Sequence, residues 1–319
     1  MPIINQVVSG GGTTPTGTIN ITTNGTHDVT NYATADVLVP TTAPTYYREF
    51  MLTGTGTLMS DTTTTHIMDF TGVKGLASYV LQEAYLGNNN ISGLVDMSDL
   101  ELLSGVYSCN NMFGACSGIT GVDMSSLTQI SGTYCCANMF QYSSITTVNM
   151  SSLQVVSGST ACGNMFAFCT GLTSVDISAL TTLSGNSCCN GMFKGCSALT
   201  SVALTSLQEI SGANAFANAF AFTGLTSLTF PSLSVLTASN AIKQICQDCL
   251  ALTSISFPAL TSTSFGSQTT QFDNMLLNVT GCTVHFPSNL QSVIGSWASV
   301  TAGFGGTNTT VSFDLPATT

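Results

Sequence analysis

One stretch decides the fold: Cys109-Asn110-Asn111-Met112-Phe113-Gly114-Ala115-Cys116. Its Met-Phe pair returns three more times, and the four methionines are 27, 26 and 27 residues apart. They are Met112, Met139, Met165 and Met192. Weaker copies extend the series on both sides, at Tyr85-Leu86, Ala219-Phe220, Ile245-Cys246 and Met275-Leu276. A fixed period of this length is typical of a solenoid, so we expect about eight stacked coils.

Each coil contains a short strand pattern followed by a helical pattern. Val175 and Ile177 alternate with polar residues, so their side chains should face inward from a strand. After a Ser-Gly turn, apolar residues recur at i, i+3, i+4 and i+7, the spacing of one face of a short helix. These residues are Cys189, Met192, Phe193 and Cys196. The predicted fold class is therefore a β/α solenoid, with a parallel sheet on one face, short helices on the other, and a cap at each end.

Three apolar columns keep their register from coil to coil, which predicts one continuous core. The strand column is Val122, Val148, Val175, Val202, Leu228 and Ile255. A second column is Leu100, Leu127, Leu153, Leu180, Leu207 and Leu233. A third column is Leu103, Ile130, Val156, Leu183, Ile210 and Leu236.

Composition divides the chain into six segments. Residues 1–16 are expected to form a flexible or particle-docking tail, and 17–40 a small β module with a hairpin turn at Asn24-Gly25. Residues 41–45 are a linker, 46–76 the N-terminal cap, 77–282 the solenoid and 283–319 the C-terminal cap. Within the last segment we expect a strand at Thr283–Pro287, a helix from an N-cap at Ser288 to Trp297, and a closing strand at Thr309–Leu315.

Residues 17–40 resemble a module that is common in phage structural proteins. The matching positions are Ile21-Thr22, Asn24-Gly25-Thr26, Asp28-Val29-Thr30, Tyr32 to Val37 and Val39-Pro40, while His27 stands where the module usually has an aromatic residue. The resemblance implies a phage virion protein. It covers only this short segment of the chain.

The coils resemble the BspA-like (Treponema-type) leucine-rich repeats. The resemblance is carried by Cys169-Thr170-Gly171-Leu172-Thr173-Ser174-Val175, by Phe230-Pro231-Ser232-Leu233 and by Phe257-Pro258-Ala259-Leu260. It implies a leucine-rich-repeat-like solenoid. The coils depart from that family in their greater length and in having Met-Phe where the family has Ala-Phe.

Charge excludes two classes of partner. The net charge is −11, and the only cations are Arg48, Lys74, Lys194 and Lys243. A nucleic-acid-binding protein needs a basic stripe to displace counterions from phosphates, and an anionic membrane attracts the same residues. The mean hydropathy is +0.37, but the sequence contains no run of 18 apolar residues, so no membrane-spanning helix is predicted. The N-terminus has no pattern of a secretory signal.

The twelve cysteines lie in columns. Cys109, Cys136, Cys162 and Cys189 precede the methionine position by three residues, and Cys116, Cys169, Cys196 and Cys249 follow it by four. Inward positions favour buried free thiols. Disulfides between columns and metal binding are the alternatives, the latter suggested only by Cys246-Gln247-Asp248-Cys249.

No catalytic constellation emerges. His27, His66 and His285 lie in three different regions, so no Ser/His/Asp or Cys/His set can be placed, and no cofactor or catalytic residue is predicted. A column of asparagines precedes the Met-Phe position and is expected to form side-chain amide ladders between coils. Its members are Asn111, Asn138, Asn164, Asn218 and Asn274.

The candidate binding face is the outward side of the strands. Its residues are Asp96, Asp123, Asn149, Ser174, Asp176, Ser201, Ser227 and Thr229. A solvated strand face is one interpretation, a weak calcium site along the aspartates is another, and a hydrogen-bonding surface for glycans is a third.

Three function classes follow. The first is a phage virion fibre, spike or decoration subunit, assembled in the host cytoplasm, that docks on other virion proteins through residues 1–16 and displays the solenoid for adhesion or host recognition. The second is a BspA-like adhesin on an extracellular cell surface, and the third, which we disfavour, is an enzyme. A cell-surface glycan or protein would be the ligand. A homo-oligomer is compatible with the first class, but no coiled-coil heptad supports it.

Overall fold

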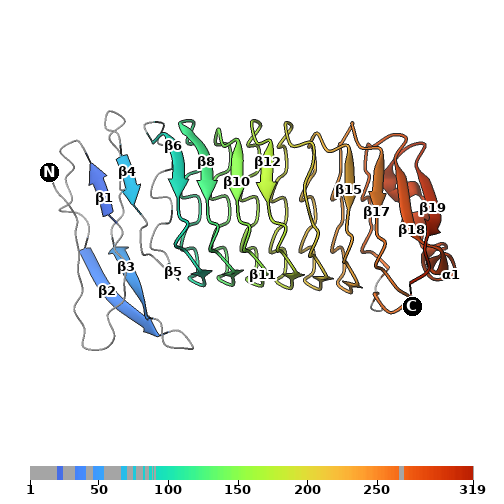
Figure 1. Cartoon of the computed structure of the whole chain (residues 1–319), viewed down its shortest axis with the longest axis horizontal. Helices are drawn as coiled ribbons and strands as arrows, with labels where there is room; N and C mark the ends of the chain where they lie inside the picture. Colours follow the sequence, from blue (N-terminus) through green and yellow to red (C-terminus); the bar gives the residue numbers. More distant parts are fainter. Residues whose placement is uncertain are drawn as a thin grey trace.

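The computed structural model describes residues 91–265 and 269–318, the strand segments 20–23, 33–40, 46–53, 66–69 and 75–76, and the single residues Gln82, Leu86, Gly87 and Asn89. The architecture is a β-solenoid of about eight turns, whose coils stack along the long axis of the molecule (Figure 1). This confirms the predicted solenoid. No helix in the described part of the chain has the length and hydropathy needed to cross a membrane.

One face consists of parallel strands, and we call it the strand face. Its first sheet contains β6 (Gly93–Asp96), β8 (Ile119–Asp123), β10 (Thr147–Asn149) and β12 (Ser174–Asp176). Its second sheet contains β15 (Ser227–Thr229), β17 (Ser254–Ser256), β18 (Thr283–Pro287) and β19 (Thr310–Leu315). Val148 lies in register between Val122 and Val175, and all three side chains are buried. The strand column is thus confirmed at these positions.

The second face is a single parallel sheet of seven two-residue strands. They are β5 (Gly75–Leu76), β7 (Leu102–Leu103), β9 (Gln129–Ile130), β11 (Val155–Val156), β13 (Thr182–Leu183), β14 (Glu209–Ile210) and β16 (Val235–Leu236). The second residue of every pair is buried, as the third apolar column predicts. Each of these strands from β7 to β14 is followed by Ser-Gly, where the chain bends into the next face.

The third face holds the Met-Phe stretches, and the expected helices are absent there. We call it the turn face. In Tyr107–Cys116, alternate N–H groups donate across to the next coil, as from Asn111 to the carbonyl of Ala137 (3.0 Å). The N–H groups between them close four-residue β-turns, as from Met112 to the carbonyl of Cys109 (3.2 Å). An α-helix would instead direct every N–H to the carbonyl four residues earlier in its own coil.

The helix prediction was wrong because two periods select the same side chains over so short a stretch. The backbone enters the left-handed region at every fourth residue, with φ of 55° at Tyr107, 53° at Asn111 and 57° at Ala115. A period of four and a helical period of 3.6 both direct i, i+3, i+4 and i+7 inward. The asparagine column is the signal that was misread, because asparagine is among the residues that tolerate positive φ.

The predicted amide ladder is not what the asparagines form. Asn111, Asn138, Asn164, Asn218 and Asn274 all have positive φ, between 50° and 55°. Among the described residues, no hydrogen bond joins two amides of this column; Asn111 donates instead to the neighbouring Asn110 side chain (3.0 Å). Their role is therefore to hold the backbone turn.

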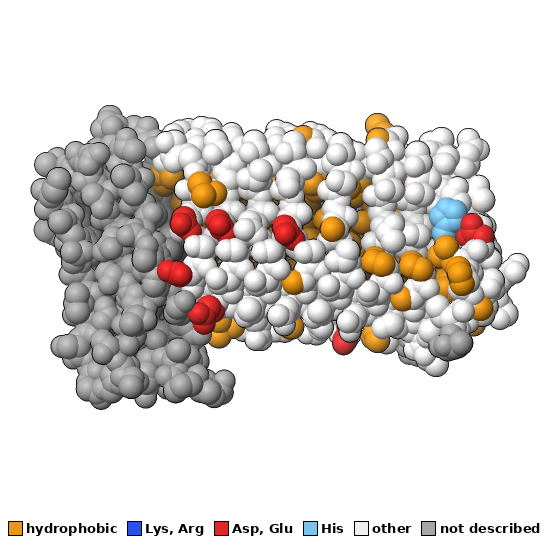
Figure 2. Space-filling view, viewed as in Figure 1, with side chains coloured by type: hydrophobic (Ala, Val, Ile, Leu, Met, Phe, Trp, Pro, Cys, Tyr) orange, Lys and Arg blue, Asp and Glu red, His pale blue; other side chains and the backbone are white. Residues whose placement is uncertain are grey.

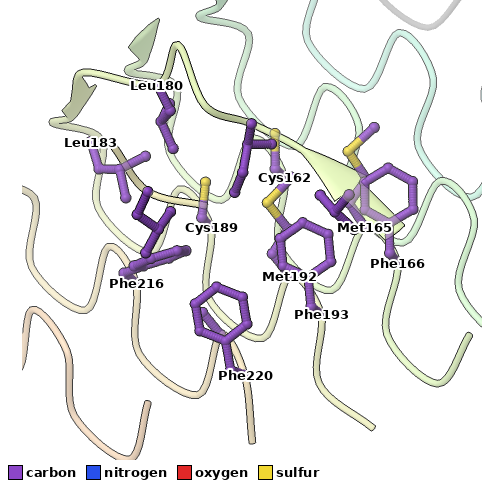
Figure 3. Packing of buried hydrophobic residues seen from close by; sticks show 14 of the residues in the cluster. Cys162, Met165, Phe166, Leu180, Leu183, Cys189, Met192, Phe193, Phe216 and Phe220 are labelled. Carbon is purple, nitrogen blue, oxygen red and sulfur yellow. The ribbon is translucent and has the colours of Figure 1, made fainter. Parts of the chain in front are cut away.

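The core is a set of stacked ladders. Phe113, Phe140, Phe166, Phe193 and Phe220 stack nearly parallel, with ring centroids 5.2 to 5.7 Å apart, and all are fully buried. Methionine and cysteine side chains of successive coils lie beside the rings, as Figure 3 shows for Cys162 and Met165 next to Cys189 and Met192. Four coils thus contribute a cysteine, a methionine and a phenylalanine to one continuous core, and the coil of Phe220 has Phe216 and Ala219 in place of the first two.

The two ends of the chain differ from the expectations. β1 (Asn20–Thr23) pairs antiparallel with β4 (His66–Asp69), and β2 (Ala33–Pro40) pairs with β3 (Tyr46–Thr53). The strands of residues 17–40 therefore pair with segment 46–76, rather than with each other around Asn24-Gly25. The linker 41–45, the turn itself and tail 1–16 lie outside the described residues.

At the C-terminus, η1 (Ser288–Leu290), α1 (Gln291–Ile294), α2 (Ala298–Thr301) and η2 (Gly303–Gly305) replace the single expected helix. No side chain caps η1 or α1, so the N-cap assigned to Ser288 was wrong. Trp297 instead precedes α2 and packs edge-on against Phe265 (5.1 Å), where it covers the end of the core. The closing strand is present as β19.

Candidate functional site

The candidate binding face is the strand face, and it is polar with little charge. Figure 2 shows acidic side chains in a row over the first strands of the solenoid, on a surface made mostly of uncharged polar groups. Asp96, Ser174, Asp176, Ser201, Ser227 and Thr229 are exposed, whereas Asp123 and Asn149 are half-buried. The structure therefore places all eight predicted residues at the surface.

The aspartates and Asn149 have a structural role at the ends of the strands. The Oδ1 atom of each accepts the N–H two residues further on, as from Ser125 to Asp123 (3.0 Å) and from Ser151 to Asn149 (3.2 Å). Asn149 also donates to Asp123 across the coils (3.2 Å). Such turns fix the direction in which the chain leaves the strand. No group of three potential metal ligands occurs among the described residues, so the calcium interpretation gains no support.

A threonine column, which the sequence analysis missed, lies beside these residues. Its members are Thr120, Thr146, Thr173, Thr200, Thr226 and Thr253. The hydroxyl of Thr146 donates to the carbonyl of Thr120 (2.8 Å), and Thr173 repeats this bond to Thr146 (3.2 Å). At Thr146, Thr173 and Thr253 the hydroxyl proton is thus used between coils, and the oxygen lone pairs remain to accept hydrogen bonds from a ligand. The recurrence of threonine at coil spacing was the available signal.

A seam interrupts the strand face between β12 and β15. Residues Ser201–Leu204 form no strand, although they occupy the strand position of their coil. Among the described residues, nothing accepts a hydrogen bond from their N–H groups. Val202 is only half-buried, unlike the other members of its column. The predicted strand at Val202 was therefore wrong.

One feature that distinguishes the seam from β8, β10 and β12 is the residue at the end of this strand position. Ala203 stands where Asp123, Asn149 and Asp176 accept an N–H group, and alanine has no acceptor. In Figure 2 apolar side chains are visible between the row of acidic residues and the C-terminal strands. This coil is thus the least regular part of the face.

We expect the seam to open more readily than its neighbours. In hydrogen-exchange measurements, the amides of Ser201–Leu204 should exchange faster than those of Ser174–Asp176, because they have no partner on either side. Ala203→Asp should slow this exchange and raise the free energy of unfolding by about 0.5–1 kcal/mol, since it restores the turn. Ala203→Leu, which supplies no acceptor, is the control. Equal exchange in both variants contradicts this explanation.

All twelve cysteines are buried and none is in a disulfide. A hydrogen bond from Cys246 lowers the pKa of Cys249 to about 7. Burial opposes this shift, and hydrogen bonds with Thr223 add to it. Burial raises the pKa of Cys282 to about 11. The thiol columns therefore line the core, as their inward positions predict.

The side chain of His285 is hydrogen-bonded to a carboxylate. His285 Nδ1 lies 2.9 Å from both carboxylate oxygens of Asp314, which joins β18 to β19. A hydrogen bond from His285 lowers the pKa of Asp314, and a bond from Ser312 adds to this. Because the Ser312 hydroxyl bonds to the carboxylate rather than to the imidazole, the three residues do not form a nucleophilic triad. The side chains of His27 and His66 lie outside the described part.

The strand face thus offers hydroxyl, amide and carboxylate groups in fixed rows, with one irregular coil among them. Comparisons with family models, curated proteins and solved structures give no match to this chain.

Proposed function

We propose that the protein is a phage virion structural protein, namely a fibre, spike or decoration subunit that displays its solenoid for surface adhesion or host recognition. The observation that carries the adhesion role is the strand face, where coil after coil repeats hydroxyl and amide groups in register. A rigid array of this kind can make many weak hydrogen bonds to a repeating ligand at once, so affinity accumulates through multivalency.

The phage setting rests on a different part of the chain. Residues 17–40 resemble a phage structural module, and residues 1–16 precede it as a candidate docking segment. We propose assembly in the host cytoplasm and contact with other virion proteins through residues 1–16. A leucine-rich-repeat relationship of the BspA-like kind remains part of this proposal, with a bacterial surface adhesin as the alternative.

An enzyme is the least supported class. His285 is the only histidine whose side chain is described, and it bonds to Asp314 between the last two strands. The thiols are buried in the core, and the carboxylates of the strand face hold turns. These groups have structural partners, which supports a binding role over catalysis.

Deleting residues 1–16 should abolish incorporation of the protein into particles while leaving the solenoid folded, because the coils begin far downstream of the deletion. Mass spectrometry of purified virions measures incorporation, and circular dichroism of the purified variant measures folding. A variant with residues 1–16 in scrambled order is the matched control for length. Undiminished incorporation of the deletion variant refutes the docking role, and absence of the intact protein from virions refutes the phage setting.

A further inference from the structure

An outer column of aromatic residues lies where the turn face leads into the strand face. Tyr142, Phe168 and Phe222 each follow the Met-Phe position of their coil by the same number of residues. Tyr142 is 59% exposed and Phe222 41%. The inner phenylalanine ladder, in contrast, is fully buried. The outer column therefore does little to build the core.

The backbone does not require aromatic residues at these positions. All three are in the left-handed region, with φ of 60°, 61° and 60°, which is unfavourable for a bulky side chain. Other coils place Gly195, Asp248 or Asn278 at this position with the same sign of φ. Each N–H donates to the next coil in the same way, from Phe222 to Gln247 (2.8 Å) and from Asp248 to Leu277 (2.8 Å). Strain and exposure together point to a role of the side chains themselves.

The rings form two aromatic surfaces with a break between them. Tyr142 stacks on Phe168 with centroids 4.9 Å apart and planes 6° apart. The preceding member of the column is Ala115, whose small side chain leaves the outer side of Tyr142 accessible. Beyond Phe168 the column continues with Gly195, and the Phe168 ring lies so close that a Cβ there would be 2.5 Å from its Cδ1 atom. Phe222 follows on the far side of Gly195.

Lys194 lies beside Gly195, at the break between the two aromatic surfaces, in a protein whose net charge is −11. The Nζ atom of Lys194 lies 5.7 Å from the centroid of the Phe222 ring. Lys194 is one of only two cationic side chains between residues 91 and 318. The carboxylate at the next position of the column, Asp248, is held by the amide of Asn278 (3.0 Å). Lys194 therefore offers its charge to a ligand beside the aromatic ring.

We propose that Tyr142, Phe222 and Lys194 bind a saccharide whose pyranose rings carry carboxylates. The axial C–H groups of a pyranose are weakly positive and pack against the negative face of an aromatic ring. Lys194 pairs with the carboxylate, and because the rings of successive coils stack face to face, a pyranose on a ring face lies across the solenoid axis. This site lies outside the strand face, so it adds a second recognition surface to the proposed adhesion function.

The test is calorimetric titration of the full chain with tetragalacturonate, using maltotetraose as the neutral probe. Tyr142→Asn and Phe222→Asn should each weaken tetragalacturonate binding about tenfold or more, since each removes one aromatic surface. Neither should lower the thermal midpoint, because asparagine occupies left-handed positions throughout this fold. Lys194→Gln should reduce the affinity for tetragalacturonate to that for maltotetraose or below it, because the net negative charge of the protein then repels the carboxylates.

Tyr134→Asn is the matched control. Tyr134 has φ of 52°, is 38% exposed and stacks on Tyr107 at 5.0 Å, but it lies at the opposite end of the turn segment from Tyr142. It should leave binding unchanged. The proposal is overturned if neither sugar binds, if Lys194→Gln keeps the preference for the charged sugar, or if Tyr134→Asn weakens binding as much as Phe222→Asn. None of these outcomes affects the incorporation test above, so the two proposals fail separately.

Discussion

Gly185→Ala should destabilise the protein by about 3 kcal/mol or more, one of the two largest effects that we expect from a single substitution. A Cβ at Gly185 would stand 2.4 Å from the carbonyl oxygen of Gly158 and 2.6 Å from that of Ser157. Both neighbours are backbone atoms of the preceding coil, so no side-chain rotation relieves the overlap. The coils would have to separate at the bend. Urea denaturation followed by circular dichroism measures the loss.

The control is another glycine of the same region, Gly171. A Cβ there would meet the carbonyl oxygen of Ile145 at 3.7 Å, an ordinary contact, and its φ is not positive. Gly171→Ala should therefore be neutral or stabilise the fold by up to about 1 kcal/mol, because it restricts the unfolded chain. If both variants lose the same stability, close approach of the coils at the Ser-Gly bends is not what makes glycine necessary.

The repeat and its core were predictable from the sequence because a fixed period constrains every coil in the same way. In the third apolar column, for example, Leu103, Ile130, Val156 and Leu183 face inward as expected. The local conformation at the Met-Phe stretch was not predictable from apolar spacing, since the turn and the helix bury the same residues. Only backbone dihedral preferences distinguish them, and these appeared in the sequence as the asparagine column.

The candidate site was predictable only in part, for a related reason. Alternation along the strands placed Ser174 and Asp176 outward, and the structure agrees. Alternation does not reveal hydrogen bonds between coils, so the seam at Ser201–Leu204 was missed, although Ala203 interrupts the polar column in the sequence. The outer aromatic column was missed as well, because the other coils place Ala115, Gly195, Asp248 or Asn278 at this position and so interrupt the aromatic repeat.

Phe193→Ala should cost about 3–5 kcal/mol and should also divide the unfolding transition into two. Phe193 is fully buried between Phe166 (5.5 Å) and Phe220 (5.7 Å), so its removal breaks the inner ladder at one coil. The next coil, which stacks on Phe193 through Phe220, contains the seam, where no N–H group of Ser201–Leu204 donates to another described residue. Coupling between the two halves of the solenoid would then depend on the ladder of β13 and β14 and on the backbone bonds of the turn face.

Because each coil contacts only its neighbours, a weakened interface lets the halves unfold independently. Trp297 reports the C-terminal half by fluorescence, whereas circular dichroism reports both halves, so the two midpoints should separate in Phe193→Ala and coincide in the unmodified protein. Phe140→Ala is the matched variant, since that ring occupies the same ladder beside an intact strand face. It should lose similar stability but keep one transition. Coincident midpoints in both variants would show that the seam does not weaken the coupling between coils.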